Sequence, residues 1–199
     1  YAYDVEAEDS AWFYLYSLIE TDEDPDPKRT ALRWNDTIQH TQKFNNYYAY
    51  DDGTAEMGYG LSGQGTRNAR IAYRFISYQE DTLQGVNICF NPPYNEVNRD
   101  VYFKLSLWNN INGKPGEIIY SKMKDSYKVE YGSAPNQFIF YEFDTTLMVS
   151  DTFYIGLVQV KDEFLNMGFD LSYNNQNKLF FNLEGDWKSS SFEGSLMMR

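Results

Sequence analysis

Val101-Tyr102-Phe103-Lys104-Leu105-Ser106-Leu107-Trp108 is the stretch that decides the fold of this chain of 199 residues. Its apolar residues Phe103, Leu105 and Leu107 alternate with the more polar Lys104 and Ser106. Alternation of this kind places one set of side chains on one face of a β-strand. The stretch therefore predicts a strand with one face buried in a core.

Similar short apolar segments recur along the chain from Tyr47 onward. Turn signals rich in Asn, Gly and Pro separate them, for example at 91–93, 109–116 and 131–136. The expected strands are 69–78, 82–90, 101–108, 117–121, 137–143, 153–160, 166–171, 178–182 and 195–198. We predict an all-β fold, an antiparallel, jelly-roll-like β-sandwich of about nine strands with an N-terminal arm.

Residues 1–30 differ from the rest of the chain in charge. They hold nine acidic and two basic residues, which is a large part of the net charge of −12. Strand formers dominate 1–5 and 11–19, whereas 20–27 is an acidic stretch with two prolines, which favours an extended linker. We expect residues 1–30 to form an N-terminal arm, or the end of an upstream domain, with this linker, and residues 31–199 to form the sandwich domain. Whether residues 1–19 belong to that sandwich stays open.

Composition excludes several classes of function. A single cysteine (Cys89) and a single histidine (His40) exclude a disulfide framework and multi-cysteine zinc sites, and they leave little room for His-based catalysis. No apolar run approaches the roughly 20 residues of a membrane helix, so no membrane insertion is expected. The chain also lacks the basic clusters that bind nucleic acid. The G-x-G-x-x-G match at 58–63 lacks the flanking strand and helix of a dinucleotide site, and we interpret it as a glycine-rich loop.

The segment Asp51-Asp52-Gly53-Thr54-Ala55-Glu56 is the most notable acidic cluster outside residues 1–30. Calcium prefers carboxylate and carbonyl oxygens, and a glycine-containing turn supplies both. The segment lacks the spacing of an EF-hand, and aspartates in turns also accept hydrogen bonds from nearby backbone N–H groups. Two interpretations remain: a structural calcium ion held by Asp51, Asp52 and Glu56, or an ordinary turn.

Two tryptophans lie beside polar segments near the ends of expected strands. Trp108 precedes Asn109 and Asn110, and Trp187 follows Gly185-Asp186. Aromatic rings supply apolar contact to a ligand, and a few polar side chains fix its orientation. We predict Trp108, Asn109, Asn110 and Trp187 as glycan-binding residues, with burial of the tryptophans in the core as the alternative. No catalytic residue is predicted.

Several segments together resemble a region of large secreted proteins of Bacteroidetes. They are 46–56 with Gly58-Tyr59-Gly60-Leu61, 108–116, 153–156, 166–170 and 194–199. In those proteins the β-rich region precedes a C-terminal type IX secretion sorting domain. The resemblance covers residues 37–199 and implies a secreted protein, or one on the outer surface of a bacterium, but it implies no activity. The sequence contains neither the sorting domain nor an export leader, so we expect neighbouring domains in a longer chain.

These features predict a non-catalytic extracellular or cell-surface module that binds a glycan or another macromolecule, such as a surface protein, in the manner of an adhesin or an accessory binding domain. A structural spacer next to a sorting domain is the alternative. A glycoside hydrolase is the third and least favoured interpretation. It requires two carboxylates at a fixed separation, and no spacing among the 29 acidic residues singles out a pair.

Overall fold

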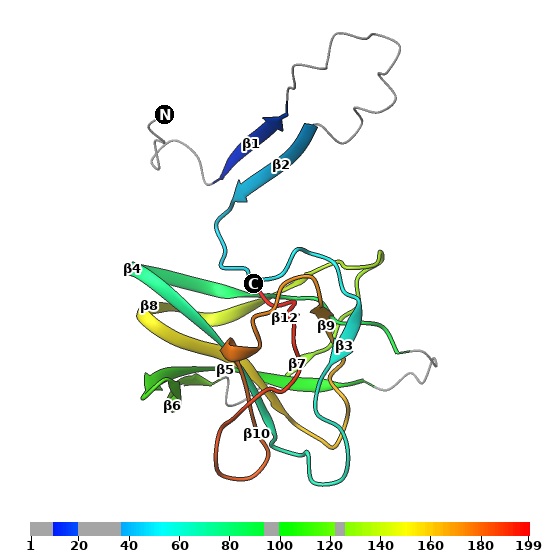
Figure 1. Cartoon of the computed structure of the whole chain (residues 1–199). Coiled ribbons are helices and arrows are strands. Elements are labelled where there is room, and N and C mark those ends of the chain that lie inside the picture. The colour runs from blue at the N-terminus through cyan, green and yellow to red at the C-terminus, as the bar shows by residue number, and fades with distance from the viewer. Residues whose placement is uncertain (1–9, 20–36, 94–99, 122–125) are drawn as a thin grey trace. The chain divides into compact units, whose positions relative to one another are not determined.

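The computed structural model describes residues 10–19, 37–93, 100–121 and 126–199, and the chain divides into two compact units, Tyr1–Tyr48 and Ala49–Arg199. In the first unit, β1 (Ala11–Leu18) and β2 (Thr37–Phe44) form a two-stranded antiparallel sheet (Figure 1). The large side chains of Tyr14, Tyr16 and Leu18 on β1 are more than half exposed. The predicted domain boundary at 30/31 lies outside the described residues.

The second unit holds ten strands in its described part. They are β3 (Met57–Tyr59), β4 (Arg70–Ile88), β5 (Tyr102–Ile111), β6 (Lys114–Ser121), β7 (Tyr127–Lys128), β8 (Ile139–Gln159), β9 (Met167–Asp170), β10 (Leu179–Asn182), β11 (Lys188–Ser189) and β12 (Ser195–Leu196), with a 3-10 turn, η2 (Gln176–Lys178), before β10. A seven-stranded sheet has the order β11-β10-β4-β8-β5-β6, with β7 beside β5, and a three-stranded sheet has the order β12-β9-β3. The prediction of an all-β, antiparallel sandwich is confirmed.

Strands β4 and β8 are longer than the sequence predicted. Strand β4 takes the place of the two expected strands 69–78 and 82–90. Strand β8 takes the place of the expected strands 137–143 and 153–160. The two long strands pair with each other, and their register shifts between Ser77 and Asp81 and between Leu83 and Gly85. A bulge interrupts the alternation of side chains without ending a strand, so the polar residues at these shifts resemble turns in the sequence.

The main core lies on one face of the seven-stranded sheet. Ile71 of β4, Leu157 of β8 and Leu105 of β5 are in register and buried, which confirms the buried face predicted for 101–108. Tyr73 belongs to the same face, and burial raises the pKa of its hydroxyl well above the usual value. Ser195 and Leu196 of β12 lie beside the Tyr73 hydroxyl, so the three-stranded sheet packs against this face.

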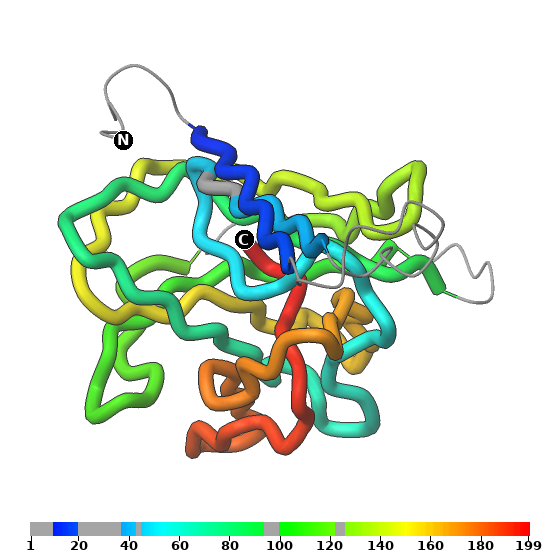
Figure 2. The backbone as a smooth tube through the Cα atoms, turned by 45° about the horizontal axis from the view of Figure 1, so that its top comes forward, coloured from blue at the N-terminus to red at the C-terminus, as the bar shows by residue number. Residues whose placement is uncertain are grey.

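The C-terminal segment 195–199 joins the two sheets, and Figure 2 shows it in red as it crosses the second unit. On one side β12 pairs with β9. On the other side the Cys89 N–H donates to the Met197 carbonyl at 3.1 Å, and Asn87 exchanges two backbone hydrogen bonds with Arg199 at 2.8 and 2.9 Å. The side chains of Met197 and Met198 are fully buried. This short segment therefore completes both the hydrogen bonding and the apolar packing between the sheets.

An ion pair fixes this segment to the loop before β3. Arg199 Nη2 lies 2.6 Å from Asp51 Oδ1, and Arg199 Nε donates to both carboxylate oxygens at 3.2 Å. The Asp51 side chain is fully buried and that of Arg199 is 17% exposed. The guanidinium also lies 4.3 Å from the centroid of the Phe138 ring. Asp51 additionally accepts the Gly53 N–H at 2.9 Å, so its carboxylate is held by several charge-assisted bonds.

We expect Arg199→Ala or Asp51→Ala to lower the free energy of unfolding by about 3–5 kcal/mol, because each leaves its partner charge buried and unpaired. Urea unfolding followed by circular dichroism measures this change. The matched control is Lys128→Ala, which breaks a 2.7 Å ion pair with Asp100 between two side chains that are more than half exposed. The control should leave the unfolding midpoint in place. Equal shifts for the control and the Arg199 variant would contradict the assignment.

We also expect the thiol of Cys89 to be protected in the folded protein. Cys89 is buried, and burial raises the pKa of its thiol, so less of the reactive thiolate is present at any pH near neutrality. Ellman's reagent at pH 8 should label the native chain slowly and the urea-unfolded chain at the rate of free cysteine. Native labelling at the unfolded rate would show that the segment 195–199 does not stay packed over Cys89.

Candidate ligand-binding site

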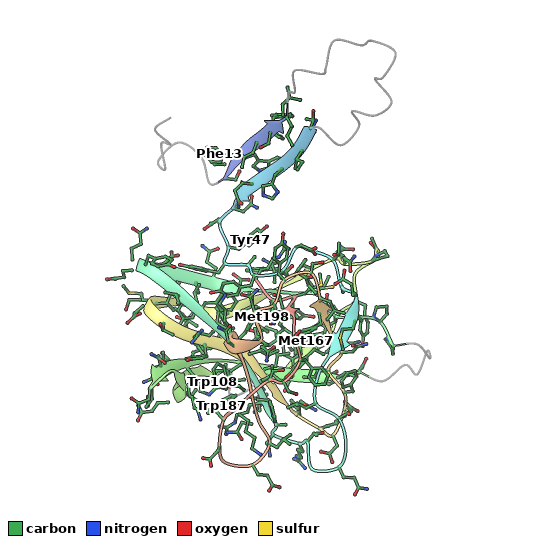
Figure 3. All side chains as sticks on the ribbon, in the orientation of Figure 1. Phe13, Tyr47, Trp108, Met167, Trp187 and Met198 are labelled. Carbon is green, nitrogen blue, oxygen red and sulfur yellow. The ribbon has the colours of Figure 1, made fainter. Side chains whose placement is uncertain are left out.

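Trp108 and Trp187 pack against each other on the second face of the seven-stranded sheet. Trp108 is fully buried in a cluster with Ala72, Tyr154 and Phe180. The Trp187 ring meets it edge to face, with centroids 5.3 Å apart (Figure 3). Trp108 therefore has no ring face open to a ligand, and Trp187, which is partly buried, covers it. The two predicted aromatic residues are brought together, but as a small core.

Asn109 and Asn110 hold the hairpin between β5 and β6. The Asn109 side-chain oxygen accepts the Glu117 N–H at 2.7 Å, and that of Asn110 accepts the Gly113 N–H at 3.0 Å. Asn112 and Gly113 form the two-residue loop with φ angles of 53° and 79°. Positive φ at both loop positions defines the tight turn that Asn-Gly favours. The oxygens of these two predicted binding residues are thus engaged in the hairpin.

The carboxylates of Asp51, Asp52 and Glu56 do not form one group, because only those of Asp52 and Glu56 meet, at the Thr54 hydroxyl. Asp51 pairs with Arg199, while Asp52 accepts two hydrogen bonds from Thr54, at 2.8 Å from its N–H and 2.7 Å from its hydroxyl. These bonds from Thr54 hold the pKa of Asp52 below its usual value. Glu56 accepts the Leu171 N–H at 2.8 Å. Within the described residues, no group of three or more His, Cys, Asp or Glu side chains could hold a metal ion. The bonds to Asp51 from Gly53 and to Asp52 from Thr54 are those of a turn, and the calcium ion stays a prediction.

A cleft of about 440 Å³ lies elsewhere in the second unit, between the glycine-rich loop and the hairpin of β10 and β11. Its lining comes from two segments that are far apart in the sequence. The lining residues are Leu61, Ser62, Gln64, Gly65, Thr66, Phe181, Leu183, Glu184, Asp186 and Lys188. This cleft is the candidate site.

Glycine shapes the first wall of the cleft. Gly63 and Gly65 have φ angles of 115° and 87°, which a residue with a side chain adopts only with strain. The Thr66 hydroxyl closes the turn by donating to the Gly63 carbonyl at 2.9 Å, and the Asn68 N–H donates to the Gln159 carbonyl at 2.9 Å. A Cβ at either glycine would meet no atom within 4 Å, so the backbone here borders open space.

The second wall is the hairpin that Trp187 anchors. Phe181 pairs with Lys188 across β10 and β11, and the Asn182 amide donates to the Gly185 carbonyl at 2.6 Å within the loop. Strand alternation sends Phe180 into the Trp108 cluster and Phe181 to the opposite face, where it lines the cleft. Trp187 does not line the cleft, but it holds the hairpin against the sheet and so positions the second wall.

The lining joins apolar surface to hydrogen-bonding groups. The apolar surface comes from Leu61, Phe181 and Leu183. The hydrogen-bonding groups are hydroxyl, amide, carboxylate and ammonium groups of the other lining residues. Ligand sites commonly combine apolar contact with a few polar groups that orient the ligand. The glycine-rich stretch 58–63 and Gly185-Asp186-Trp187 are both notable in the sequence, but nothing in it indicates that the two segments meet.

The chain matches no protein-family model, no curated protein and no solved structure. In the described part of the chain, no helix has the length and apolar character needed to cross a membrane. A fold alone does not define a function, which has to come from the chemistry of a site. For this chain the cleft is the candidate site.

We expect Trp187→Ala to expose Trp108 and to destabilise the second unit. The edge-to-face pair is worth about 1 kcal/mol beyond the buried area, and the loss of that area adds to it. The measurement uses a chain in which Trp12 and Trp34 are replaced by Phe, so that only Trp108 and Trp187 fluoresce. Acrylamide should quench the fluorescence of this chain less strongly than that of the same chain with Trp187→Ala, in which Trp108 alone remains. Tyr78→Ala, which removes a ring that is 96% exposed, is the control and should leave the unfolding midpoint unchanged.

Proposed function

We propose that this chain is a non-catalytic, extracellular binding module that recognises a glycan in the cleft between residues 61–66 and 181–188. The supporting observation is the mixed lining of that cleft. A sugar ring offers an apolar face and a rim of hydroxyls. Phe181 and Leu61 suit the face, while Ser62, Gln64 and Glu184 suit hydroxyls as hydrogen-bond partners.

The location that we propose is the outer surface of a bacterium or the surrounding medium, as the resemblance to secreted proteins implies. A glycan ligand agrees with that location, because exported modules meet polysaccharides there. A structural spacer would need a stable fold but no cleft with converging polar groups. The cleft therefore favours binding over the spacer.

A glycoside hydrolase is the second candidate, because Glu184 and Asp186 line the same cleft. Glycosidases generally place their two carboxyl groups on either side of the bond to be cleaved, roughly 5–10 Å apart. Here both carboxylates come from one loop and are separated by a single residue, Gly185. This arrangement suits two acceptors on one wall of a binding site better than an acid and a nucleophile that face each other.

Binding of the full chain to a panel of soluble and insoluble polysaccharides tests the proposal. We expect saturable binding to one class, and Glu184→Gln or Phe181→Ala should weaken it about tenfold, the equivalent of losing one charge-assisted hydrogen bond or one apolar contact. Glu80→Gln, an exposed acid outside the cleft, is the matched control.

Silence across the panel, or binding that is insensitive to the cleft variants, would contradict the proposal. Reducing sugars should not accumulate when the chain is incubated with a ligand that it binds. Their release, and its loss in Glu184→Gln, would replace the binding module with the hydrolase.

A further inference from the structure

The charges of the cleft point to a more specific ligand class. Its lining carries two carboxylates, Glu184 and Asp186, and one ammonium group, that of Lys188, so its formal charge is one negative unit. Arg67 follows the lining residue Thr66 in the sequence, and Arg70 pairs with Asn182 of β10, but neither arginine lines the cleft. Among the residues that the structure describes, none of the three charged lining groups forms an ion pair. Neither carboxylate therefore has a cation within ion-pair distance in the described part of the chain.

We infer that the cleft selects uncharged glycans and rejects acidic ones, such as polymers of uronic acids; this inference rests on the proposed binding of a glycan. The reason lies in hydrogen-bond chemistry. An ionised carboxylate only accepts hydrogen bonds, whereas a sugar hydroxyl can donate one. Hydroxyls of a neutral sugar satisfy Glu184 and Asp186. A carboxylate on the sugar would place an acceptor against acceptors of the same charge.

Glu184, Asp186 and Lys188 are exposed to solvent, so this discrimination acts through water. Water and salt weaken the interactions of exposed charges, so the expected effect is largest at low ionic strength. Lys188 offers one favourable partner to an acidic sugar, but two carboxylates on the same wall oppose it. The net charge of −12 on the chain adds a weaker repulsion that acts at longer range. A test must therefore separate the local carboxylates from the overall charge.

Pairs of polysaccharides that share a backbone and differ in charge provide this test. Suitable pairs are hydroxyethyl cellulose with carboxymethyl cellulose, dextran with carboxymethyl dextran, and methyl-esterified with de-esterified homogalacturonan. In low salt, we expect the full chain to bind the neutral member of at least one pair ten or more times more tightly than the acidic member, as about 1.4 kcal/mol of repulsion would require. Higher salt should narrow this ratio, because it screens the repulsion.

Two double variants with the same change in net charge separate the local effect from the general one. Glu184→Gln with Asp186→Asn removes the cleft carboxylates and should bring the neutral-to-acidic affinity ratio close to one. Glu80→Gln with Glu193→Gln removes two exposed acids outside the cleft lining and should leave the ratio near that of the unchanged chain. Thermal unfolding of both variants shows whether the fold is kept.

The outcomes distinguish charge selection by the cleft from the proposed glycan binding itself. Equal or tighter binding of the acidic members overturns the charge selection but leaves a glycan-binding module. Equal changes in the ratio for both double variants overturn the role of the cleft carboxylates and assign the selection to overall charge. Absence of binding to every member of every pair, as well as to the wider panel, overturns the proposed function itself.

Discussion

The ion pair between Asp51 and Arg199 is the constraint on which the rest of the second unit depends. It joins positions 148 residues apart, and the Asp51 side chain is fully buried. Such a pair gains little net stability over an apolar contact of the same size, but it penalises any arrangement in which one charge loses its partner. With it in place, the backbone of Arg199 exchanges hydrogen bonds with Asn87, and this short segment links the two sheets beside the Gly168–Cys89 and Phe90–Met167 contacts.

The seven-stranded sheet has buried residues on both faces, covered by different means. One face packs against the three-stranded sheet and the C-terminal segment, while part of the other is covered by Trp187 over Trp108. The aromatic pair gives the hairpin of β10 and β11 a fixed position at the edge of the sheet. A feature that serves packing on one side thereby positions Glu184, Asp186 and Lys188 on the other. The stability of this hairpin and the proposed binding are therefore coupled.

Short-range interactions shape both walls of the cleft. Positive-φ glycines and a threonine cap shape one wall, and a hydrogen-bonded loop with an anchored tryptophan shapes the other. A preformed site loses little conformational entropy when it binds a ligand. Its acidic character then decides which ligands can use the polar groups.

The sequence alone determined the class of fold and several local structures. Alternation in 101–108 predicted a strand with one buried face, because side chains of a strand point to opposite faces in turn. Turn-forming residues marked 109–116, where Asn112 and Gly113 indeed make a tight loop. These features depend on neighbouring residues, so a local pattern suffices to find them.

Only the tertiary structure decided which residues meet. Asp51 carries the chemistry of a calcium ligand, yet its position opposite Arg199 makes it half of an ion pair. Trp108 has the ring that a sugar could stack on, yet the hairpin from β10 to β11 covers it with Trp187. The cleft forms where 61–66 and 181–188 come together, and no local pattern encodes that meeting. Pairing between distant strands fixes it, because the register of a sheet is set by the whole set of buried faces.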